Sequence, residues 1–224
     1  MFHRKCRSNA RLDGKTVVIT GANTGIGKAT ALDLTRRGGR VILACRDLKR
    51  AQDAADDIRR KTSGTEGAGE VLTVHLDLSS LDSVRECAQT LLRTEKYINI
   101  LINNAGVCLC PKGLTKDGFE MQFGVNHLGH FLFTNLLLPR IMRSAPARII
   151  IVSSHIHVMR PTDIFLDDVA WENRPYSTFK AYSHSKLANV LFAKELAVKL
   201  QGTGGDNLCF RPGSSSDRGL TARG

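Results

Sequence analysis

The segment TVVITGANTGIG, residues 16–27, decides the fold of this chain, because an apolar run passes through glycine-spaced positions into a helical pattern. Glycines let the backbone turn tightly at a strand end and approach a diphosphate closely, while free N–H groups at a helix start attract the anion. A glycine triplet alone is a weak signal, but the strand before it and the helix after it supply the context it needs. The segment predicts a nucleotide-binding turn, with an ordinary strand-to-helix connection as the alternative.

Apolar runs and helical patterns alternate along the rest of the chain. We expect strands at 16–20, 40–45, 70–76, 98–103, 147–153 and about 205–211, and helices at 25–37, 47–62, 80–95, 117–143 and 177–201. This alternation is typical of a parallel sheet covered by helices on both faces. The predicted fold class is α/β, a doubly wound parallel sheet of the Rossmann type. We divide the chain into a basic arm at 1–13, one dinucleotide-binding and catalytic domain at 14–213, and a tail at 214–224.

The composition is that of an ordinary globular protein, with 42% apolar and 24% charged residues. The net charge of +11 predicts attraction to acidic surfaces. The basic arm lacks interleaved aromatic residues and any nucleic-acid motif, so we expect no nucleic-acid partner. Six scattered cysteines favour reduced thiols, and Cys108 and Cys110 lack a second ligand pair for a metal. No apolar run is long enough to span a bilayer, so we expect no transmembrane segment.

Tyr182 and Lys186 lie four residues apart in a helical pattern, so both side chains project from one face of the helix. A phenol with its ordinary pKa of about 10 is a poor base at neutral pH, and a neighbouring ammonium would lower that pKa. Such a pair is common by chance, and an exposed pair without function is the alternative. Its place after several polar strand ends favours the functional interpretation.

Polar residues follow two further apolar runs. Ser153 and Ser154 follow the run at 148–152, and the segment NNAG at 103–106 ends the run that begins at 98. Folds of this kind bind ligands at the carboxyl ends of their strands. Asn126 lies further along, in the segment GVNHLG. Together with the glycine turn, these residues predict a dehydrogenase site.

On these segments the chain resembles the short-chain dehydrogenase/reductase family, and within it the retinol dehydrogenase group. The matching segments, over about residues 13–213, are TGANTGIG, ILACRD, LDLSS, ILINNAGV, VNHLGHF, SAPARIIIVSS, YSHSKLANVLFAKEL and RPG. The resemblance implies that Tyr182 is the general acid or base, and that Lys186 lowers the pKa of Tyr182 and holds the nicotinamide ribose. It implies further that Ser154 donates a hydrogen bond to the substrate oxygen, and that Asn126 anchors a proton-relay water.

Arg46, after the predicted strand 40–45, favours NADP(H) over NAD(H), because a guanidinium suits the 2′-phosphate of NADP. Asp47, in contrast, favours NAD(H). The alternative for Arg46 is that it is a solvated charge at the start of a helix, without a role in cofactor binding. Asp77 resembles the family's adenine-contacting position, with an N-terminal helix cap as the competing interpretation. The predicted cofactor-binding residues are Gly21, Asn23, Thr24, Gly25, Ile26, Gly27, Arg46, Asp77, Leu78, Asn104, Ala105, Gly106, Tyr182, Lys186, Pro212 and Gly213.

The C-terminal segment departs from the family pattern. The family continues beyond its Pro-Gly with a threonine that holds the carboxamide, a substrate-covering helix and a last strand, whereas residues 214–224 here are polar and rich in glycine. We therefore expect a disordered tail, and a domain without the usual last strand and substrate lid. Two functions are compatible with this: an NADP(H)-dependent oxidoreductase for an apolar, retinol-like alcohol or carbonyl, or a truncated NADP(H)-binding protein with weak or no activity.

The resemblance also bears on partners. Retinol dehydrogenases commonly work on membrane-dissolved substrates, which implies peripheral contact on the cytoplasmic side of a membrane such as the endoplasmic reticulum. The apolar helical segments 131–141 and 187–200 offer a surface for pairing two subunits into a homodimer.

Overall fold

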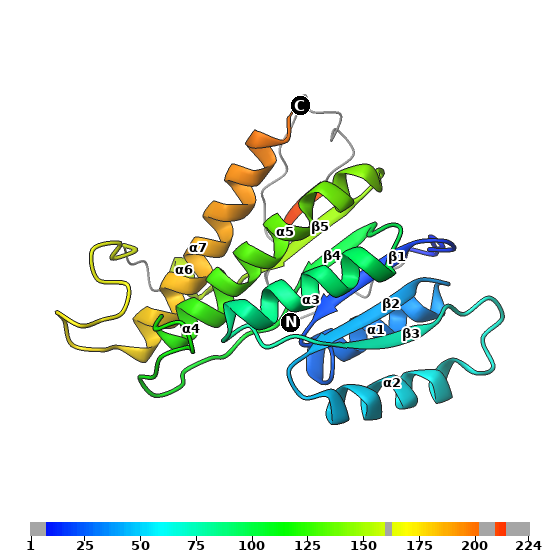
Figure 1. Cartoon of the computed structure of the whole chain (residues 1–224), viewed down its shortest axis with the longest axis horizontal. Helices are drawn as coiled ribbons and strands as arrows, with labels where there is room; N and C mark the ends of the chain where they lie inside the picture. The colour runs from blue at the N-terminus through cyan, green and yellow to red at the C-terminus, as the bar shows by residue number, and fades with distance from the viewer. Residues whose placement is uncertain (1–7, 160–162, 202–208, 214–224) are drawn as a thin grey trace.

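The computed structural model describes residues 8–159, 163–201 and the backbone of 209–213. Figure 1 shows a single sheet of parallel strands in the order β3-β2-β1-β4-β5-β6, flanked by helices. The strands are β1 (Thr16–Thr20), β2 (Arg40–Cys45), β3 (Val71–His75), β4 (Ile100–Asn103), β5 (Arg148–Val152) and β6 (Cys209–Gly213). The helices are α1 (Gly25–Arg36), α2 (Leu48–Thr62), α3 (Leu81–Thr94), α4 (Met121–Phe123), the π-helix η1 (Gly124–Leu128), α5 (Gly129–Arg143), α6 (Ile156–Met159) and α7 (Thr178–Lys199). The predicted doubly wound parallel sheet is confirmed.

The central strand β1 is buried along its whole length, and its alternating side chains build two separate cores. Val17 and Ile19 belong to the core under α1 and α2. Val18 points to the opposite face, into the core shared with α3, α5 and α7. This two-sided burial explains why the strand is an uninterrupted apolar run without polar alternation.

Short polar side chains determine where several helices begin. Asp47 accepts a hydrogen bond from the Arg50 N–H and caps α2. Ser80 caps α3 by accepting from the Ser83 N–H. The alternative that Asp77 caps this helix is therefore wrong, because Ser80 lies closer to the first turn and takes that role.

The single helix expected at 117–143 is also wrong. The segment begins its helical turn only at Met121, where the buried Glu120 carboxylate accepts from the N–H groups of Gln122 and Phe123. A π-helical stretch then separates α4 from α5. A π turn holds one more residue than an α turn, so it changes which side chains face the sheet. Asn126 lies in this stretch.

The last strand differs from the expected range of about 205–211. It spans Cys209–Gly213 and pairs in parallel with β5, with Val152 opposite Gly213. On β5, Ile149 and Ile151 are buried, while Ile150 and Val152 are only partly covered within the described residues. The tail at 214–224 and the first seven residues of the arm lie outside the described residues, so the predicted disorder of the tail is not tested.

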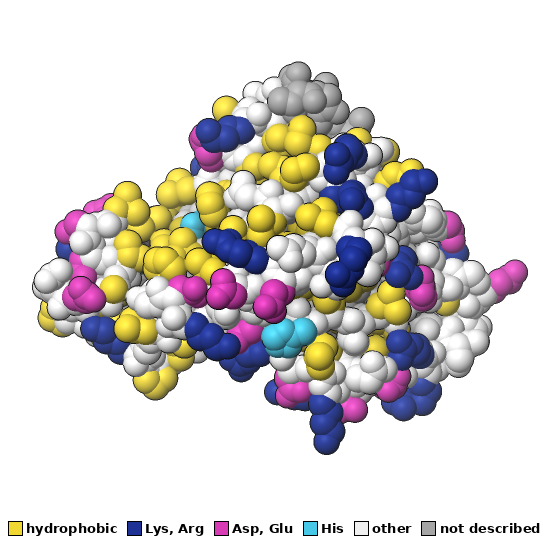
Figure 2. Space-filling view, in the orientation of Figure 1, with side chains coloured by type: hydrophobic (Ala, Val, Ile, Leu, Met, Phe, Trp, Pro, Cys, Tyr) yellow, Lys and Arg dark blue, Asp and Glu magenta, His cyan; other side chains and the backbone are white. Residues whose placement is uncertain are grey.

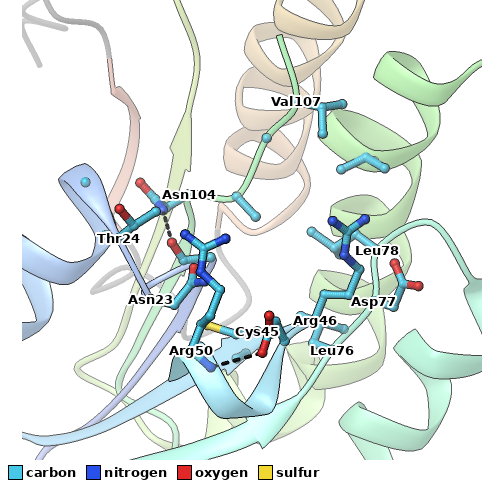
Figure 3. Close-up of a pocket in the computed structure, with 18 of the residues that line it drawn as sticks. Asn23, Thr24, Cys45, Arg46, Arg50, Leu76, Asp77, Leu78, Asn104 and Val107 are labelled. Carbon is cyan, nitrogen blue, oxygen red and sulfur yellow. Dashed lines mark hydrogen bonds between the residues drawn. The ribbon is translucent and has the colours of Figure 1, made fainter. Parts of the chain in front are cut away.

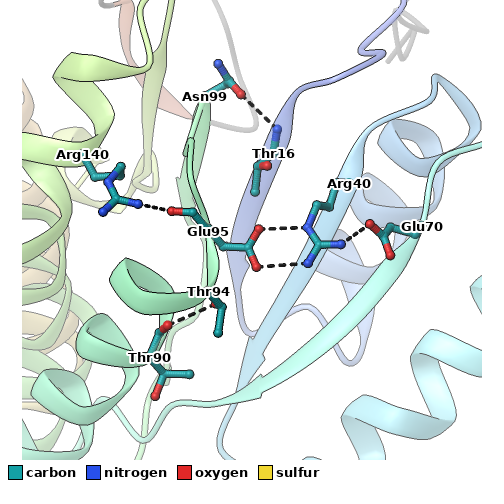
Figure 4. A network of polar contacts seen from close by, with 8 residues as sticks. All are labelled: Thr16, Arg40, Glu70, Thr90, Thr94, Glu95, Asn99 and Arg140. Atoms are coloured by element: carbon teal, nitrogen blue, oxygen red, sulfur yellow. Dashed lines mark hydrogen bonds and ion pairs between the residues drawn. The ribbon is translucent and has the colours of Figure 1, made fainter.

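An ion-pair network ties elements together at the end of the sheet opposite the strand carboxyl ends (Figure 4). The Arg40 guanidinium donates to both carboxylate oxygens of Glu95, at 2.8 and 3.1 Å, and also bonds Glu70. Arg140, on α5, donates to the backbone carbonyl of Glu95. The start of β2 is thereby fixed to the segments that follow α3 and precede β3.

Candidate functional site

A cleft of about 650 Å³ opens at the carboxyl ends of β1, β2 and β4 (Figure 3). The strand order reverses between β1 and β4, which is where doubly wound folds bind ligands. Twelve of the predicted cofactor-binding residues line this cleft: Gly21, Asn23, Thr24, Gly25, Ile26, Gly27, Arg46, Asp77, Leu78, Asn104, Ala105 and Gly106. The fold therefore gathers four separate segments of the sequence around one cavity.

The glycine turn needs its glycines for two physical reasons. Gly21 and Gly25 have φ angles of 65° and 55°, which side chains rarely adopt. A Cβ on Gly21 would lie 2.8 Å from the Ala105 Cβ, and one on Gly27 would lie 2.6 Å from the Asn104 amide nitrogen. The turn after β1 thus packs directly against the turn after β4.

The helix that follows the glycine turn begins without a side-chain cap. Within the described chain, its N-cap residue Thr24 makes no capping hydrogen bond. The first N–H groups of α1 therefore have no side-chain acceptor at the cleft, and the positive end of the helix dipole points there as well. This arrangement is suited to a phosphate group.

Two guanidinium groups border the cleft beyond β2. Arg46 and Arg50 both line it from opposite sides, and Asn23 and Thr24 lie on the side of Arg50 (Figure 3). The sequence analysis missed Arg50, which lies on the first turn of α2, whereas Arg46 precedes the N-cap of that helix. Asp47 lies between them, but one of its carboxylate oxygens is occupied by the Arg50 N–H. The presence of an acidic residue here, which would favour NAD(H), is thus explained by its role as the cap of α2.

Asp77 and Leu78 line the cleft beside Arg46, on the side away from Asn23 and Thr24. The Asp77 carboxylate accepts from the Ser79 N–H at 3.0 Å and from the Ser79 hydroxyl at 2.6 Å. Burial acts to raise the pKa of Asp77, but these hydrogen bonds together with the positive charges of Lys116 and Arg46 outweigh it, and the pKa lies below its ordinary value. The Asp77 side chain is therefore a fixed carboxylate at the rim of the cleft.

Ser154, Tyr182 and Lys186 meet next to the cleft. The Ser154 hydroxyl lies near the Tyr182 hydroxyl and acts to lower the pKa of Tyr182. Lys186 lies with its ammonium 5.6 Å from the centre of the Tyr182 ring. A Cβ on Gly106, in the cleft wall, would be 3.6 Å from the same ammonium. The structure thus brings three of the four predicted catalytic residues together beside the predicted cofactor site.

The direction of the Tyr182 pKa differs from the expectation. Burial raises the pKa of Tyr182, with the nearby Cys108 adding to the rise, and the nearby Ser154 hydroxyl only partly offsets it. The Lys186 ammonium donates to the Val152 carbonyl at 3.3 Å. Burial also lowers the pKa of Lys186, to about 8. The predicted lowering of the tyrosine pKa by its lysine partner is therefore not seen in this structure.

The two neighbouring serines have different environments. The buried Ser153 hydroxyl donates to the Lys186 carbonyl at 2.8 Å, which fixes strand β5 to helix α7. Ser154 is partly exposed and faces the tyrosine. The choice of Ser154 over Ser153 as the group at the reacting oxygen is consistent with this geometry.

Asn126 holds the segment that follows β4. Its amide oxygen accepts from the Val107 N–H at 2.8 Å, and its amide nitrogen donates to the Val107 carbonyl at 2.9 Å and to Ser185 at 3.0 Å. Both polar atoms of the side chain are thus bound to protein groups. The backbone carbonyl of Asn126 has two partners of its own, His130 Nδ1 and the Asn189 amide, each at 3.1 Å, so the predicted anchoring of a water by Asn126 is not supported by a vacant polar atom.

The sequence analysis also missed Cys108, which lies near Tyr182 and acts to raise the pKa of Tyr182. The Gln122 side chain supports this position by accepting from the Leu109 N–H at 2.9 Å and donating to the Thr178 carbonyl at 2.9 Å. Only the position of Cys108 just after NNAGV could have indicated it. Among the described residues, no group of histidine, cysteine or acidic side chains could hold a metal ion.

Pro212 and Gly213 lie at the carboxyl end of β6, opposite Ile151 and Val152 of β5. The backbone thus brings them to the same edge of the sheet as Ser154. Their side-chain environment lies outside what the structure describes, so their role at the cofactor stays a prediction.

Comparison with known proteins identifies relatives over most of the chain. The family described as short chain dehydrogenase matches residues 15–164. Human retinol dehydrogenase 13 is 55% identical over 208 residues, which is 93% of this chain and 61% of that protein. The crystal structure of an uncharacterised protein from Mycobacterium paratuberculosis is 45% identical, with a TM-score of 0.75, and the match covers 89% of this chain and 67% of that one.

A more distant structure is that of Pseudomonas aeruginosa RhlG in an active-site complex with NADP, at 26% identity and a TM-score of 0.68, covering 93% of this chain and 73% of that one. The chain spans about three fifths of the length of the retinol dehydrogenases that it matches. In the described part of the chain, no helix combines the length and the apolar character needed to cross a membrane.

Proposed function

The chain belongs to the short-chain dehydrogenase family, and from this premise we propose that it is an NADP(H)-dependent oxidoreductase that transfers a hydride between nicotinamide and an alcohol or carbonyl carbon. The observation that carries the proposal is the junction at Gly106. There, the cleft that suits a dinucleotide reaches Lys186, beside the Tyr182 hydroxyl and Ser154. Binding and chemistry can therefore occur side by side.

The residues of the cleft fit a dinucleotide phosphate. Glycine positions leave room where a Cβ would collide with the opposite wall, and the uncapped start of α1 offers N–H groups to a diphosphate. Asp77 and Leu78 would hold the adenine end. When bound, the cofactor would supply or accept the hydride, and the protein contributes position and charge.

Arg46 and Arg50 favour a 2′-phosphate over a free 2′-hydroxyl. Both guanidinium groups border the cleft, and Asn23 and Thr24 add neutral hydrogen-bonding groups. The carboxylate that would favour NAD(H), that of Asp47, is occupied as a helix cap. The NADP complex of the RhlG protein is consistent with this preference. We therefore propose NADP(H), with NAD(H) bound more weakly.

Tyr182 would act on the proton at the substrate oxygen. Because burial raises its pKa, the phenol carries its proton at neutral pH and can donate it to a carbonyl oxygen as negative charge develops there. Ser154 would donate a second hydrogen bond to that oxygen, which strengthens as the charge grows. In the opposite direction, the same tyrosine would have to be deprotonated first, so this environment favours carbonyl reduction at neutral pH.

Lys186 would hold the nicotinamide ribose and keep a positive charge near the reacting oxygen. Its pKa of about 8 leaves it mostly protonated at pH 7. Asn126 would act through Val107, whose backbone it fixes at the end of the cleft. The relay water that the family resemblance implies at Asn126 stays a prediction, since the Asn126 carbonyl already accepts hydrogen bonds from His130 and Asn189.

An apolar, retinol-like alcohol or carbonyl is the proposed substrate class, supported by the names of the relatives. Exposed apolar side chains follow Cys108 and Ser154 in the chain: Leu109, Val158 and Met159, the last of them 70% exposed. They would offer apolar contacts near the tyrosine, and would favour peripheral contact with a membrane such as the cytoplasmic face of the endoplasmic reticulum.

A homodimer is proposed through α5 and α7. Figure 2 shows apolar side chains gathered over the part of the surface where these helices lie. Phe131, Leu191 and Val198 are 45%, 50% and 61% exposed there. Burying this face against a second copy would remove apolar area from water.

The test begins with fluorescence titrations of the purified chain with NADPH and NADH, after thermal unfolding has shown that it is folded. Turnover of retinal and of a simple aldehyde follows, for the wild type and for Tyr182→Phe. We expect tighter binding of NADPH, and a Tyr182→Phe variant that binds NADPH normally but loses about 10²- to 10⁴-fold in kcat. Binding without turnover in the wild type would favour the weak or inactive NADP(H)-binding protein. A folded chain that binds neither nucleotide would overturn the proposal.

A further inference from the structure

One buried side chain, His130, lies between the cofactor cleft and the catalytic residues, and the mechanism above does not use it. The residue is on the first turn of α5 and only 1% exposed. Its Nε2 is 2.8 Å from the Thr20 hydroxyl at the end of β1, and its Nδ1 is 3.1 Å from the Asn126 carbonyl. Both ring nitrogens are thus engaged with groups that belong to different halves of the site.

The partners fix the state of the ring. A carbonyl oxygen can only accept, so Nδ1 carries the hydrogen and Nε2 is an acceptor for the Thr20 hydroxyl. Thr20 Oγ1 in turn accepts from the Asn104 and Ala105 N–H groups, each at 2.9 Å. Burial lowers the pKa of His130 to about 3, so the ring stays neutral and keeps this arrangement at physiological pH.

Each end of this connection reaches a functional group. Asn104 and Ala105 form the wall of the cleft that packs on the glycine turn. On the other side, the Asn126 carbonyl also accepts from Asn189, which lies on α7 with the catalytic tyrosine. An apolar residue of similar volume would fill the space but would leave the Asn126 carbonyl and the Thr20 hydroxyl each without a ring partner.

We propose that His130, as the neutral Nδ1–H tautomer, is a positioning residue that fixes the cofactor-cleft wall at Asn104 and Ala105 to the catalytic segment at Asn126. The inference rests on the proposed function. The ring touches neither cofactor nor substrate, and acts through Thr20 on one side and through the Asn126 carbonyl on the other. Loss of the contact with Thr20 should weaken cofactor binding, whereas loss of the contact with Asn126 should slow catalysis. Substitutions can therefore separate these two roles.

Two substitutions divide the roles, because each keeps one polar atom at the right number of bonds from Cα. In His130→Asn, the amide nitrogen replaces Nδ1 and keeps the bond to Asn126, while the Thr20 partner is lost. In His130→Gln, the side-chain oxygen replaces Nε2 as the acceptor for Thr20, while the donor to Asn126 is lost. Thr134→Val is the matched control, since Thr134 is a buried hydroxyl on the same helix that hydrogen-bonds Asn103.

We expect His130→Asn to raise the Kd for NADPH about tenfold with kcat within about twofold, because the Thr20 hydroxyl loses its 2.8 Å acceptor and keeps only the Ile102 carbonyl at 3.5 Å. We expect His130→Gln to lower kcat about tenfold with the Kd within about twofold, because the Asn126 carbonyl loses one of its two donors and keeps only Asn189. Thr134→Val should lower the Tm without separating Kd from kcat. The inference is overturned if both histidine variants behave like this control.

A second readout does not depend on activity. The ring nitrogens of His130 in the full chain, assigned by comparing nitrogen-15 spectra of the wild type and His130→Gln, should show a protonated Nδ1 and an unprotonated Nε2. Thr20→Val should shift the Nε2 signal alone. A ring that titrates between about pH 5.5 and 8, or that carries its hydrogen on Nε2, would contradict the inference even in a chain that binds no nucleotide. Failure of the proposed function would instead appear in the wild type, as absent NADPH binding.

Discussion

Lys186 keeps an ammonium group in an environment almost closed to solvent, with 4% of the residue exposed. Its spacing from Tyr182 correctly predicted that the two side chains share one face of the helix. The spacing did not predict the direction of the tyrosine pKa, because burial depends on segments distant in sequence, among them Cys108. The same limit applies to Arg50, whose place at the cleft is visible only once β2 and the glycine turn lie side by side.

The burial of Lys186 makes a stability prediction with a definite sign. Its folded pKa of about 8 lies below the ordinary value of 10.5. Below pH 8, the lysine is charged in both states and the folded state carries the full cost of burial, up to about 3 kcal/mol. Between pH 8 and 10.5 the unfolded chain binds more protons, so this cost disappears as the pH rises.

We therefore expect Lys186→Met to gain most in unfolding free energy, relative to wild type, at pH 7, and to gain progressively less toward pH 10. Urea unfolding of both proteins across this range measures the difference. Lys180→Met, which removes an exposed lysine from the same helix, should show no such trend. A difference between wild type and Lys186→Met that does not change with pH would mean that the ammonium is not destabilised by burial.

A further prediction for a single residue concerns Arg46, which we propose determines the preference for NADPH over NADH. Arg46→Asp should raise the Kd for NADPH about ten- to a hundredfold, because a charge-assisted hydrogen bond to the 2′-phosphate is lost and a like charge is added. The Kd for NADH should change little. Parallel fluorescence titrations measure both constants, and Arg143→Asp makes the same charge change at an exposed site on α5 as a control. An unchanged ratio of the two constants would refute the assignment of Arg46.

At the scale of elements, strands β1 and β2 and the starts of α2 and α3 lie within a residue or two of their predicted limits. These elements have buried apolar runs or side-chain caps that are local in sequence. The π-helical stretch Gly124–Leu128 was not predicted, because the expectation of one continuous helix assumed a single α-helical period, and the added residue of the π turn changes which side chains face the sheet. The short helix α6 was missed for a related reason, since four residues carry too little periodicity.

The cap of α2 gives a prediction for an element. Asp47→Ala should lower the unfolding free energy by about 1 kcal/mol, because the Arg50 N–H loses its acceptor, whereas Asp47→Ser keeps a capping oxygen and most of the stability. Both variants remove the same charge, so they should share one NADPH-to-NADH ratio of Kd. Thermal or urea unfolding with parallel titrations tests this. If Asp47→Ala and Asp47→Ser had different NADPH-to-NADH ratios of Kd, the cap of α2 would also influence cofactor binding through the position of the helix start.

At the scale of the whole molecule, the parallel sheet follows from the alternation of apolar runs and helices, whereas the network around Arg40 does not. Its partners Glu70 and Glu95 are 30 and 55 residues away, and nothing local marks them as a group. Hydrogen bonds and charge attraction from Glu95, and then from Glu70, raise the pKa of Arg40 above its ordinary value. The Glu95 side chain is only 6% exposed, so Arg40 takes the place of the water that would otherwise surround its carboxylate.

Removing Arg40 should therefore destabilise the fold far from the site. Arg40→Leu leaves the Glu95 carboxylate buried without its counter-ion, and we expect a loss of about 3–5 kcal/mol in unfolding free energy. Arg40→Leu with Glu95→Leu should recover most of this, because no uncompensated charge is left, and Glu70→Gln should cost less than about 1 kcal/mol since Glu70 is exposed. Urea unfolding measures all three.

Because Arg40 begins β2 while the cleft lies at the other end of that strand, the Kd for NADPH of the folded variants should equal that of the wild type. A weakened Kd in Arg40→Leu, at temperatures where the variant is fully folded, would mean that the network also positions the cofactor cleft.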